Sequence, residues 1–87
     1  MKTVNVLGST GSIGTSALSI IRQYPDDFRP NLLLAGNNLE ALQDQIRAHK
    51  PRFAAIADDR KAELLKGFLT DTADTAFLSM EDALQVD

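Results

Sequence analysis

The sequence predicts an α/β fold in which helices wind a parallel sheet on both faces. Segments rich in β-forming residues alternate with amphipathic segments of helical spacing, and short connections join them. One β-rich segment, residues 31–35, is almost continuously apolar, which suits a strand covered on both faces. This alternation favours parallel strands joined by right-handed crossovers, and hence a doubly wound sheet.

The first half of the chain contains two strand–helix pairs. A strand is expected over residues 3–7, followed by a helix from residue 12 to about residue 24, where Pro25 ends it. The next strand, residues 31–35, opens after Pro30 and ends at Gly36. A second amphipathic helix begins at residue 39 with Asn38 placed to cap it, and it ends before Pro51.

The second half repeats this order. A third strand is expected over residues 53–57, and Asp58 and Asp59 are placed to cap a helix that runs to about residue 69. Residues 70–75 form a polar turn, and residues 76–78 form a fourth short strand. Ser79 then caps a last helical segment over residues 79–84.

Composition narrows the class of protein. The chain has 87 residues, a net charge of −3, no clustered Lys or Arg and no cysteine. These features predict no nucleic-acid or membrane partner, and they exclude disulfides and thiolate chemistry. Neither a leader peptide nor a long apolar run is present, which predicts a soluble, cytoplasmic protein. Because a sheet of this size leaves an apolar edge or face open, we expect an incomplete domain.

Three glycines, Gly8, Gly11 and Gly14, lie where the first strand meets the first helix. The amides of a helix's first turn lack partners and its dipole is positive there, so this junction can bind the pyrophosphate of a dinucleotide. Gly8 would permit the turn, Gly11 would admit the pyrophosphate and Gly14 would allow close packing. The prediction is a Rossmann-like domain that binds NAD(P).

The spacing of these glycines leaves one alternative open. It is G-x-x-G-x-x-G, one residue longer than the usual dinucleotide fingerprint, so a tight turn without a ligand also fits. A P-loop does not fit, because Thr15 stands where a lysine would follow the last glycine.

The end of the second strand bears on the choice of cofactor. Gly36, Asn37 and Asn38 include no carboxylate to hold the ribose 2′-hydroxyl of NAD, and this favours NADP. The alternative is that Gly36 only ends the strand and Asn38 only caps a helix. His49 is interpreted as a solvated helix-end residue and the paired acids as turns and caps. We predict no catalytic and no metal-binding residue in these 87 residues.

Residues 8–14, GSTGSIG, resemble the signature of the 1-deoxy-D-xylulose 5-phosphate reductoisomerase family. Further similar stretches cover nearly the whole chain, namely YPDDF at 24–28, AGNN at 35–38 and PRFAAI at 51–56. The resemblance implies that residues 1–87 are an N-terminal NADPH-binding domain, itself incomplete. It carries the family's cofactor contacts over to seven positions: Thr10, Gly11, Ser12, Ile13, Gly36, Asn37 and Asn38.

One departure from the family concerns Asn37, because many members carry Lys or Arg at this position. A basic side chain there can pair with the 2′-phosphate of NADPH, whereas Asn37 can only donate neutral hydrogen bonds. The resemblance therefore leaves the strength of the preference for NADPH open.

The resemblance also implies an activity for the whole protein. The family converts 1-deoxy-D-xylulose 5-phosphate to 2-C-methyl-D-erythritol 4-phosphate in isoprenoid precursor synthesis, as a homodimer that uses NADPH and a divalent metal, manganese or magnesium. The metal- and substrate-binding parts and the C-terminal domain are expected beyond residue 87. Two alternatives remain: another NADP-dependent dehydrogenase with a GxTGxxG loop, and a nucleotide-binding module without catalysis.

Overall fold

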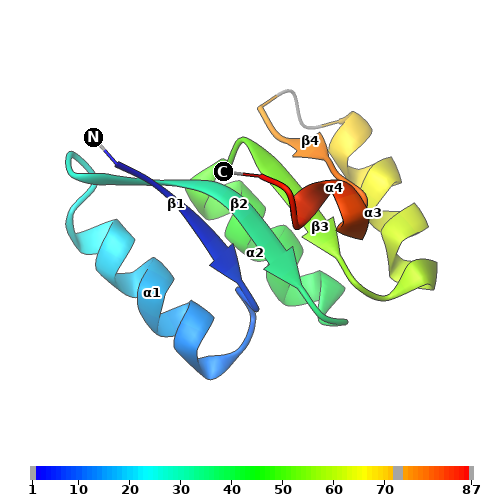
Figure 1. Cartoon of the computed structure of the whole chain (residues 1–87), viewed down its shortest axis with the longest axis horizontal. Coiled ribbons are helices and arrows are strands. Elements are labelled where there is room, and N and C mark those ends of the chain that lie inside the picture. Colours follow the sequence, from blue (N-terminus) through cyan, green and yellow to red (C-terminus); the bar gives the residue numbers. More distant parts are fainter. Residues whose placement is uncertain (1, 72–73, 87) are drawn as a thin grey trace.

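A computed structural model describes residues 2–71 and 74–86. Its strands are β1 (Lys2–Leu7), β2 (Phe28–Ala35), β3 (Phe53–Ile56) and β4 (Ala76–Phe77). Its helices are α1 (Ser12–Gln23), α2 (Leu39–His49), α3 (Asp59–Thr70) and α4 (Met80–Ala83), and they alternate with the strands along the chain (Figure 1). The predicted Rossmann-like α/β fold is confirmed. Residues 72 and 73 of the predicted turn lie outside the described residues.

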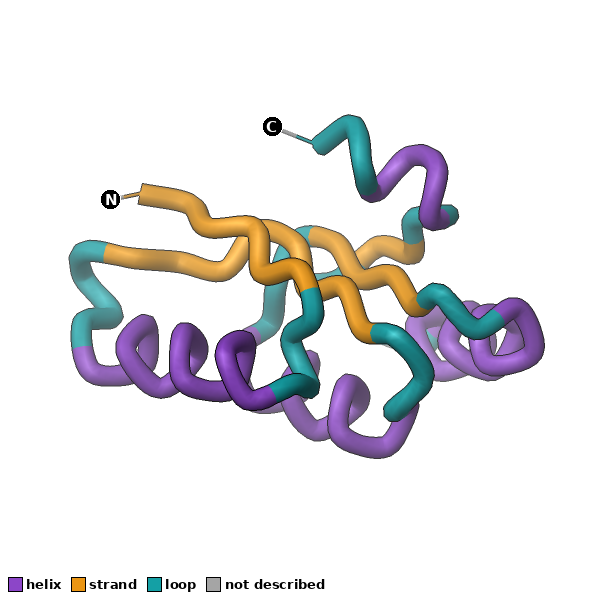
Figure 2. Tube along the Cα trace, turned by 60° about the horizontal axis from the view of Figure 1, so that its bottom comes forward, coloured by secondary structure: helices purple, strands orange, loops and turns teal. Residues whose placement is uncertain are grey.

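All four strands are parallel and lie in the sheet in chain order, β1-β2-β3-β4. The helices α1, α2 and α3 cover one face of this sheet, and the short α4 lies against the other face (Figure 2). Because every strand points the same way, the loops that follow β1, β2 and β3 meet at one edge of the sheet.

The apolar run of β2 is buried on both faces, as predicted. Leu33 belongs to the larger core, which fills the space between the sheet and α1, α2 and α3. Leu32 and Leu34 point to the opposite face, where Ala55 and Ala83 complete a smaller core. Leu32 and Leu33 are fully buried, which explains why this strand shows no alternation of polar and apolar residues.

The strand β2 begins at Phe28, three residues before the predicted start. Proline has no amide hydrogen, so Pro30 was expected to precede the strand. The register between β1 and β2 shifts at this point: Val4 pairs with Pro30, and Asn5 pairs with Leu32. The irregularity leaves Asn31 as an extra residue in β2, and the strand accommodates the proline there.

Two side-chain amides join β2 to β1, and β1 to the segment after α4. The Asn31 side chain, 8% exposed, donates to Asn5 Oδ1 at 3.0 Å. Asn5 Nδ2 in turn donates to the carbonyl oxygen of Val86 at 3.2 Å. These bonds satisfy a buried polar group and hold the segment after α4 against β1.

Candidate functional site

The loops after β1, β2 and β3 are joined to one another by backbone hydrogen bonds. The amides of Gly8 and Ser9 both donate to the carbonyl oxygen of Leu34, at 2.7 and 3.0 Å. On the other side of β2, the amide of Ala57 donates to the carbonyl oxygen of Ala35 at 2.9 Å. The amide of Asp58 donates to the carbonyl oxygen of Gly36 at 3.0 Å. The three loops therefore form one continuous surface at the carboxyl edge of the sheet.

Two glycines of the first loop are required by the fold. Gly8 has a φ of +76°, a backbone conformation that residues with a side chain rarely adopt. A Cβ atom on Gly14 would lie 2.1 Å from the carbonyl oxygen of Gly8, so α1 approaches the loop too closely for any side chain. The predicted roles of Gly8 in the turn and of Gly14 in close packing are confirmed.

Gly11 differs from both. Its φ is −81°, and an added Cβ atom would meet nothing closer than the Gly8 carbonyl oxygen at 3.4 Å. The fold has room for a side chain at this position. The lack of one leaves the backbone at the start of α1 open to an approaching ligand.

Among the residues that the structure describes, α1 is the one helix whose first turn no side chain caps. Its N-cap residue is Gly11, and the first turn contains no acidic residue. The caps of the other helices are Asn38, Asp58 and Ser79, each of which accepts a backbone hydrogen bond as predicted. The amides at the start of α1 therefore remain available to an anion, at the positive end of the helix dipole.

The four predicted site residues of the first loop lie together at this helix start. Thr10 is half-buried, whereas Gly11 and Ser12 are exposed. Ile13 is 87% exposed, an unusual environment for a large apolar side chain. The hydroxyl of Thr15 donates to the Gly11 carbonyl oxygen at 2.7 Å and supports the loop from within the helix.

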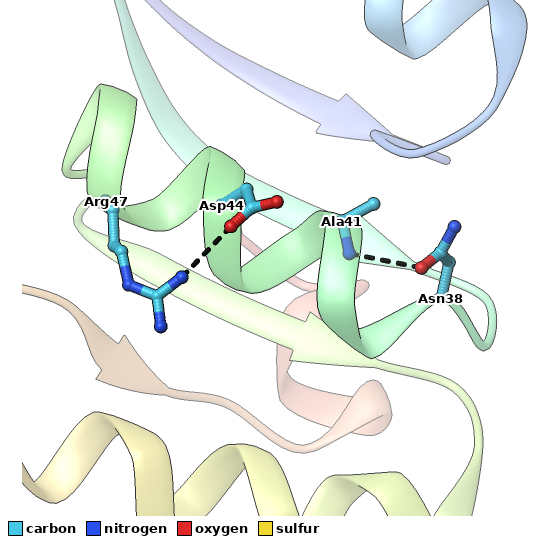
Figure 3. Close-up of polar contacts among 4 residues, drawn as sticks. All are labelled: Asn38, Ala41, Asp44 and Arg47. Atoms are coloured by element: carbon cyan, nitrogen blue, oxygen red, sulfur yellow. Dashed lines mark hydrogen bonds and ion pairs between the residues drawn. The ribbon is translucent and has the colours of Figure 1, made fainter.

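The three predicted site residues after β2, Gly36, Asn37 and Asn38, are all exposed and lie beside the first loop. Asn38 Oδ1 accepts from the amide of Ala41 at 3.1 Å, and its amide nitrogen points away from α2 (Figure 3). Asn38 thus caps a helix and also presents a donor. Asn37 and Asn38 border an open hollow of about 660 Å³, which Leu39, Glu40, Gln43 and Lys61 also line.

Lys61, which was not among the predicted site residues, reaches this hollow from the first turn of α3. Its Nζ donates to the carbonyl oxygen of Asn37. Its backbone amide donates to Asp58 Oδ1 at 3.1 Å, and this bond holds the residue in the capped turn. The predicted parallel strands offered one signal for Lys61. Loops that follow neighbouring parallel strands lie side by side, so a residue just after β3 can reach the loop after β2.

Gln45 of α2 was also missed. Its Nε2 donates to the carbonyl oxygen of Ser9 at 2.8 Å, across 36 positions of sequence. Ser9 is fully buried, so this bond holds the glycine loop from below. The hydroxyl oxygen of Ser9 and Oε1 of Gln45 are buried without a hydrogen-bond partner in the described part of the chain.

His49 lies far from these loops, at the end of α2. It is half-buried rather than solvated, and burial together with the positive charge of Arg22 lowers its pKa below the ordinary 6.5. Within residues 2–71 and 74–86, no three His, Asp or Glu side chains come together as metal ligands. No helix in those ranges is both long and apolar enough to cross a membrane.

A parallel α/β sheet with an uncapped, glycine-rich first helix start defines the chain as a Rossmann-like domain. The family model for 1-deoxy-D-xylulose 5-phosphate reductoisomerase matches residues 4–86. The chain therefore belongs to this family.

Relatives with this name include proteins from Proteus mirabilis and Nostoc punctiforme. The first is 45% identical over 97% of this chain, and the second is 51% identical over 82% of it. These matches cover 21% and 18% of the relatives, so the chain spans about a fifth of their length.

Solved reductoisomerase structures show the same fold. The Zymomonas mobilis enzyme in complex with NADPH is 35% identical, with a TM-score of 0.83 over 95% of this chain and 22% of its own. A second structure, a complex with NADPH, fosmidomycin and magnesium, is 30% identical, with a TM-score of 0.86 over 97% of this chain and 21% of its own.

Proposed function

We propose that this chain is the NADPH-binding part of a 1-deoxy-D-xylulose 5-phosphate reductoisomerase. The observation that carries the proposal is the uncapped start of α1 beneath Gly11, a glycine that the fold itself does not require. An anion at this position would accept hydrogen bonds from the amides of the first turn and would so cap the helix. Relatives of the chain include a reductoisomerase in complex with NADPH, which supports this choice of ligand.

Each predicted residue has a role in this proposal. The pyrophosphate would lie against Gly11, whose own amide already donates to the Gly8 carbonyl oxygen at 3.0 Å. It would accept hydrogen bonds from the amides of Ser12 and Ile13 and from the hydroxyls of Thr10 and Ser12. The exposed side chain of Ile13 would cover part of the bound cofactor. Gly36, Asn37 and Asn38 would face the adenosine ribose, because their loop lies next to the glycine loop across Leu34.

The whole protein would then convert 1-deoxy-D-xylulose 5-phosphate to 2-C-methyl-D-erythritol 4-phosphate, with NADPH as the hydride donor. Residues outside positions 1–87 would hold the substrate and a divalent metal, manganese or magnesium, which would polarise the substrate oxygens. A related structure is a complex with magnesium. We further propose that the protein acts in the cytoplasm as a homodimer. The part of it described here would hold and orient the cofactor.

The cofactor proposal is tested by the variant Gly11→Val in the full-length protein, with NADPH affinity followed by fluorescence titration. A bulky side chain above the helix start should weaken NADPH binding by at least about tenfold, since it blocks the pyrophosphate. Gly67→Ala is the matched control, because this exposed glycine lies in α3 with no atom within 4 Å of an added Cβ. Wild-type affinity in Gly11→Val would contradict the proposal.

Catalysis requires a separate assay. The full-length protein should oxidise NADPH in the presence of 1-deoxy-D-xylulose 5-phosphate and either metal ion. Binding of NADPH without any turnover would instead support the nucleotide-binding module without catalysis. The other alternative, a dehydrogenase of a different family with a GxTGxxG loop, is disfavoured by the family match over residues 4–86.

A further inference from the structure

The loop after β2 carries no positive charge of its own. Residues 36–38 are glycine and two asparagines, whereas NADPH differs from NADH by a 2′-phosphate that is doubly or nearly doubly charged at neutral pH. Neutral donors bind phosphate with less electrostatic gain than a cation does. A cation that reaches this loop from another element would therefore strengthen a preference for NADPH.

Lys61 is such a cation. Three consecutive carbonyl groups of the β2–α2 segment each accept one hydrogen bond from the segment around α3. Ala35 accepts from the amide of Ala57, Gly36 accepts from the following amide, and Asn37 accepts from Lys61 Nζ. The two backbone hydrogen bonds therefore fix the spacing between the loop after β2 and the loop after β3. The Lys61 ammonium group makes the third contact between these loops.

The ammonium group has donors to spare. It carries three hydrogens, of which one is directed to Asn37. In the described part of the chain, the ion pairs join Arg47 with Asp44 and Lys66 with Glu63, and neither involves Lys61. Lys61 lines the same hollow as Asn37 and Asn38, so its remaining donors are available to a ligand bound there.

We propose that Lys61 is the residue that selects NADPH over NADH, by donating to the 2′-phosphate while it remains bound to the Asn37 carbonyl. This inference rests on the proposed function. The positive charge that residues 36–38 lack would then be supplied from α3. Glu40 lines the same hollow and repels a phosphate, which makes the contribution of Lys61 more necessary.

The test compares NADPH and NADH affinities in the full-length protein and in Lys61→Gln. We expect the dissociation constant for NADPH to rise by about tenfold or more, because a charge-assisted bond to phosphate is lost. The constant for NADH should change by no more than about twofold, since NADH lacks the phosphate that this bond would hold. Lys61→Arg should restore most of the preference, because it keeps the charge.

Lys66→Gln is the matched control, because it removes the same charge from the same helix at an exposed position, where Lys66 contacts Glu63 and the Phe77 ring and lies outside the hollow. It should leave both affinities unchanged. An unchanged ratio of the two affinities in Lys61→Gln, or an equal loss of both, would overturn the assignment of Lys61 and leave the proposed function intact. Failure of the wild-type protein to bind either nucleotide would overturn both proposals.

Discussion

The β-carbon that Gly14 lacks would lie 2.1 Å from the carbonyl oxygen of Gly8. The first turn of α1 therefore rests directly on the backbone of the loop that leads into it. The fold requires the two glycines of this contact, whereas Gly11, which lies between them in sequence, has room for a Cβ atom. This division of roles can be tested by stability measurements alone.

Gly14→Ala should destabilise the protein by more than about 3 kcal/mol, because backbone atoms cannot yield to the new methyl group. Gly11→Ala should cost no more than about 1 kcal/mol, the usual effect of alanine at an N-cap. Urea denaturation of both variants measures the difference. Equal losses would show that the contact at Gly14 relaxes, and that its close packing is not needed.

Gln45→Leu should weaken the support beneath the glycine loop, because the Ser9 carbonyl loses its donor. We expect NADPH and NADH affinities to fall together by about three- to tenfold, since Gln45 acts on the loop and not on the 2′-phosphate. Titration of both nucleotides distinguishes this pattern from that of Lys61→Gln. Unaltered affinities would mean that the loop holds its shape without this bond.

Asn5→Leu should reduce the free energy of unfolding by about 1–3 kcal/mol, because the buried amide of Asn31 then lacks an acceptor. The change also releases the Val86 carbonyl and the segment after α4. Thr3→Val is the control, an exposed polar residue of the same strand, and it should have little effect. Similar unfolding curves for Asn5→Leu and the wild type would contradict this role.

The lowered pKa of His49 predicts a pH dependence of stability. Because the folded pKa lies below 6.5, the unfolded chain takes up a proton first as the pH falls. The contribution of His49 is therefore complete above pH 6.5 and is lost as the pH falls through the folded pKa. In His49→Gln, melting temperatures should fall less between about pH 7 and pH 5 than in the wild type. Identical slopes in the two proteins would refute the effect.

Local signals were sufficient for much of this molecule. The caps Asn38, Asp58 and Ser79 and the buried run of β2 follow from patterns within a few residues, and the structure confirms them. The start of β2 was predicted too late because proline usually interrupts a strand, whereas here a shift in register accommodates it. That shift depends on β1, so it could not be seen in β2 alone.

Part of the candidate site could likewise be predicted from local sequence, whereas the rest depends on contacts between distant segments. Its seven predicted residues lie in two adjoining loops and in the first turn of α1, which follows from the order of strand, glycine loop and helix. Lys61 lies 24 positions along the chain from its partner Asn37. Gln45 lies 36 positions from its partner Ser9. Single long polar side chains at partly buried helix positions form no sequence pattern, so the contacts that they make depend on which strands become neighbours.

The order of the strands has a consequence for how the protein is made. Each described strand after the first pairs with the strand that precedes it in the chain. A polypeptide leaving the ribosome amino-terminus first can therefore add β2 to β1, then β3, then β4, in the order of translation. The glycine loop gains its anchor on Leu34 as soon as β2 has docked, and Lys61 arrives afterwards. This strand order allows the surface at the carboxyl ends of the strands to form progressively during synthesis, from the loop after β1 toward α3.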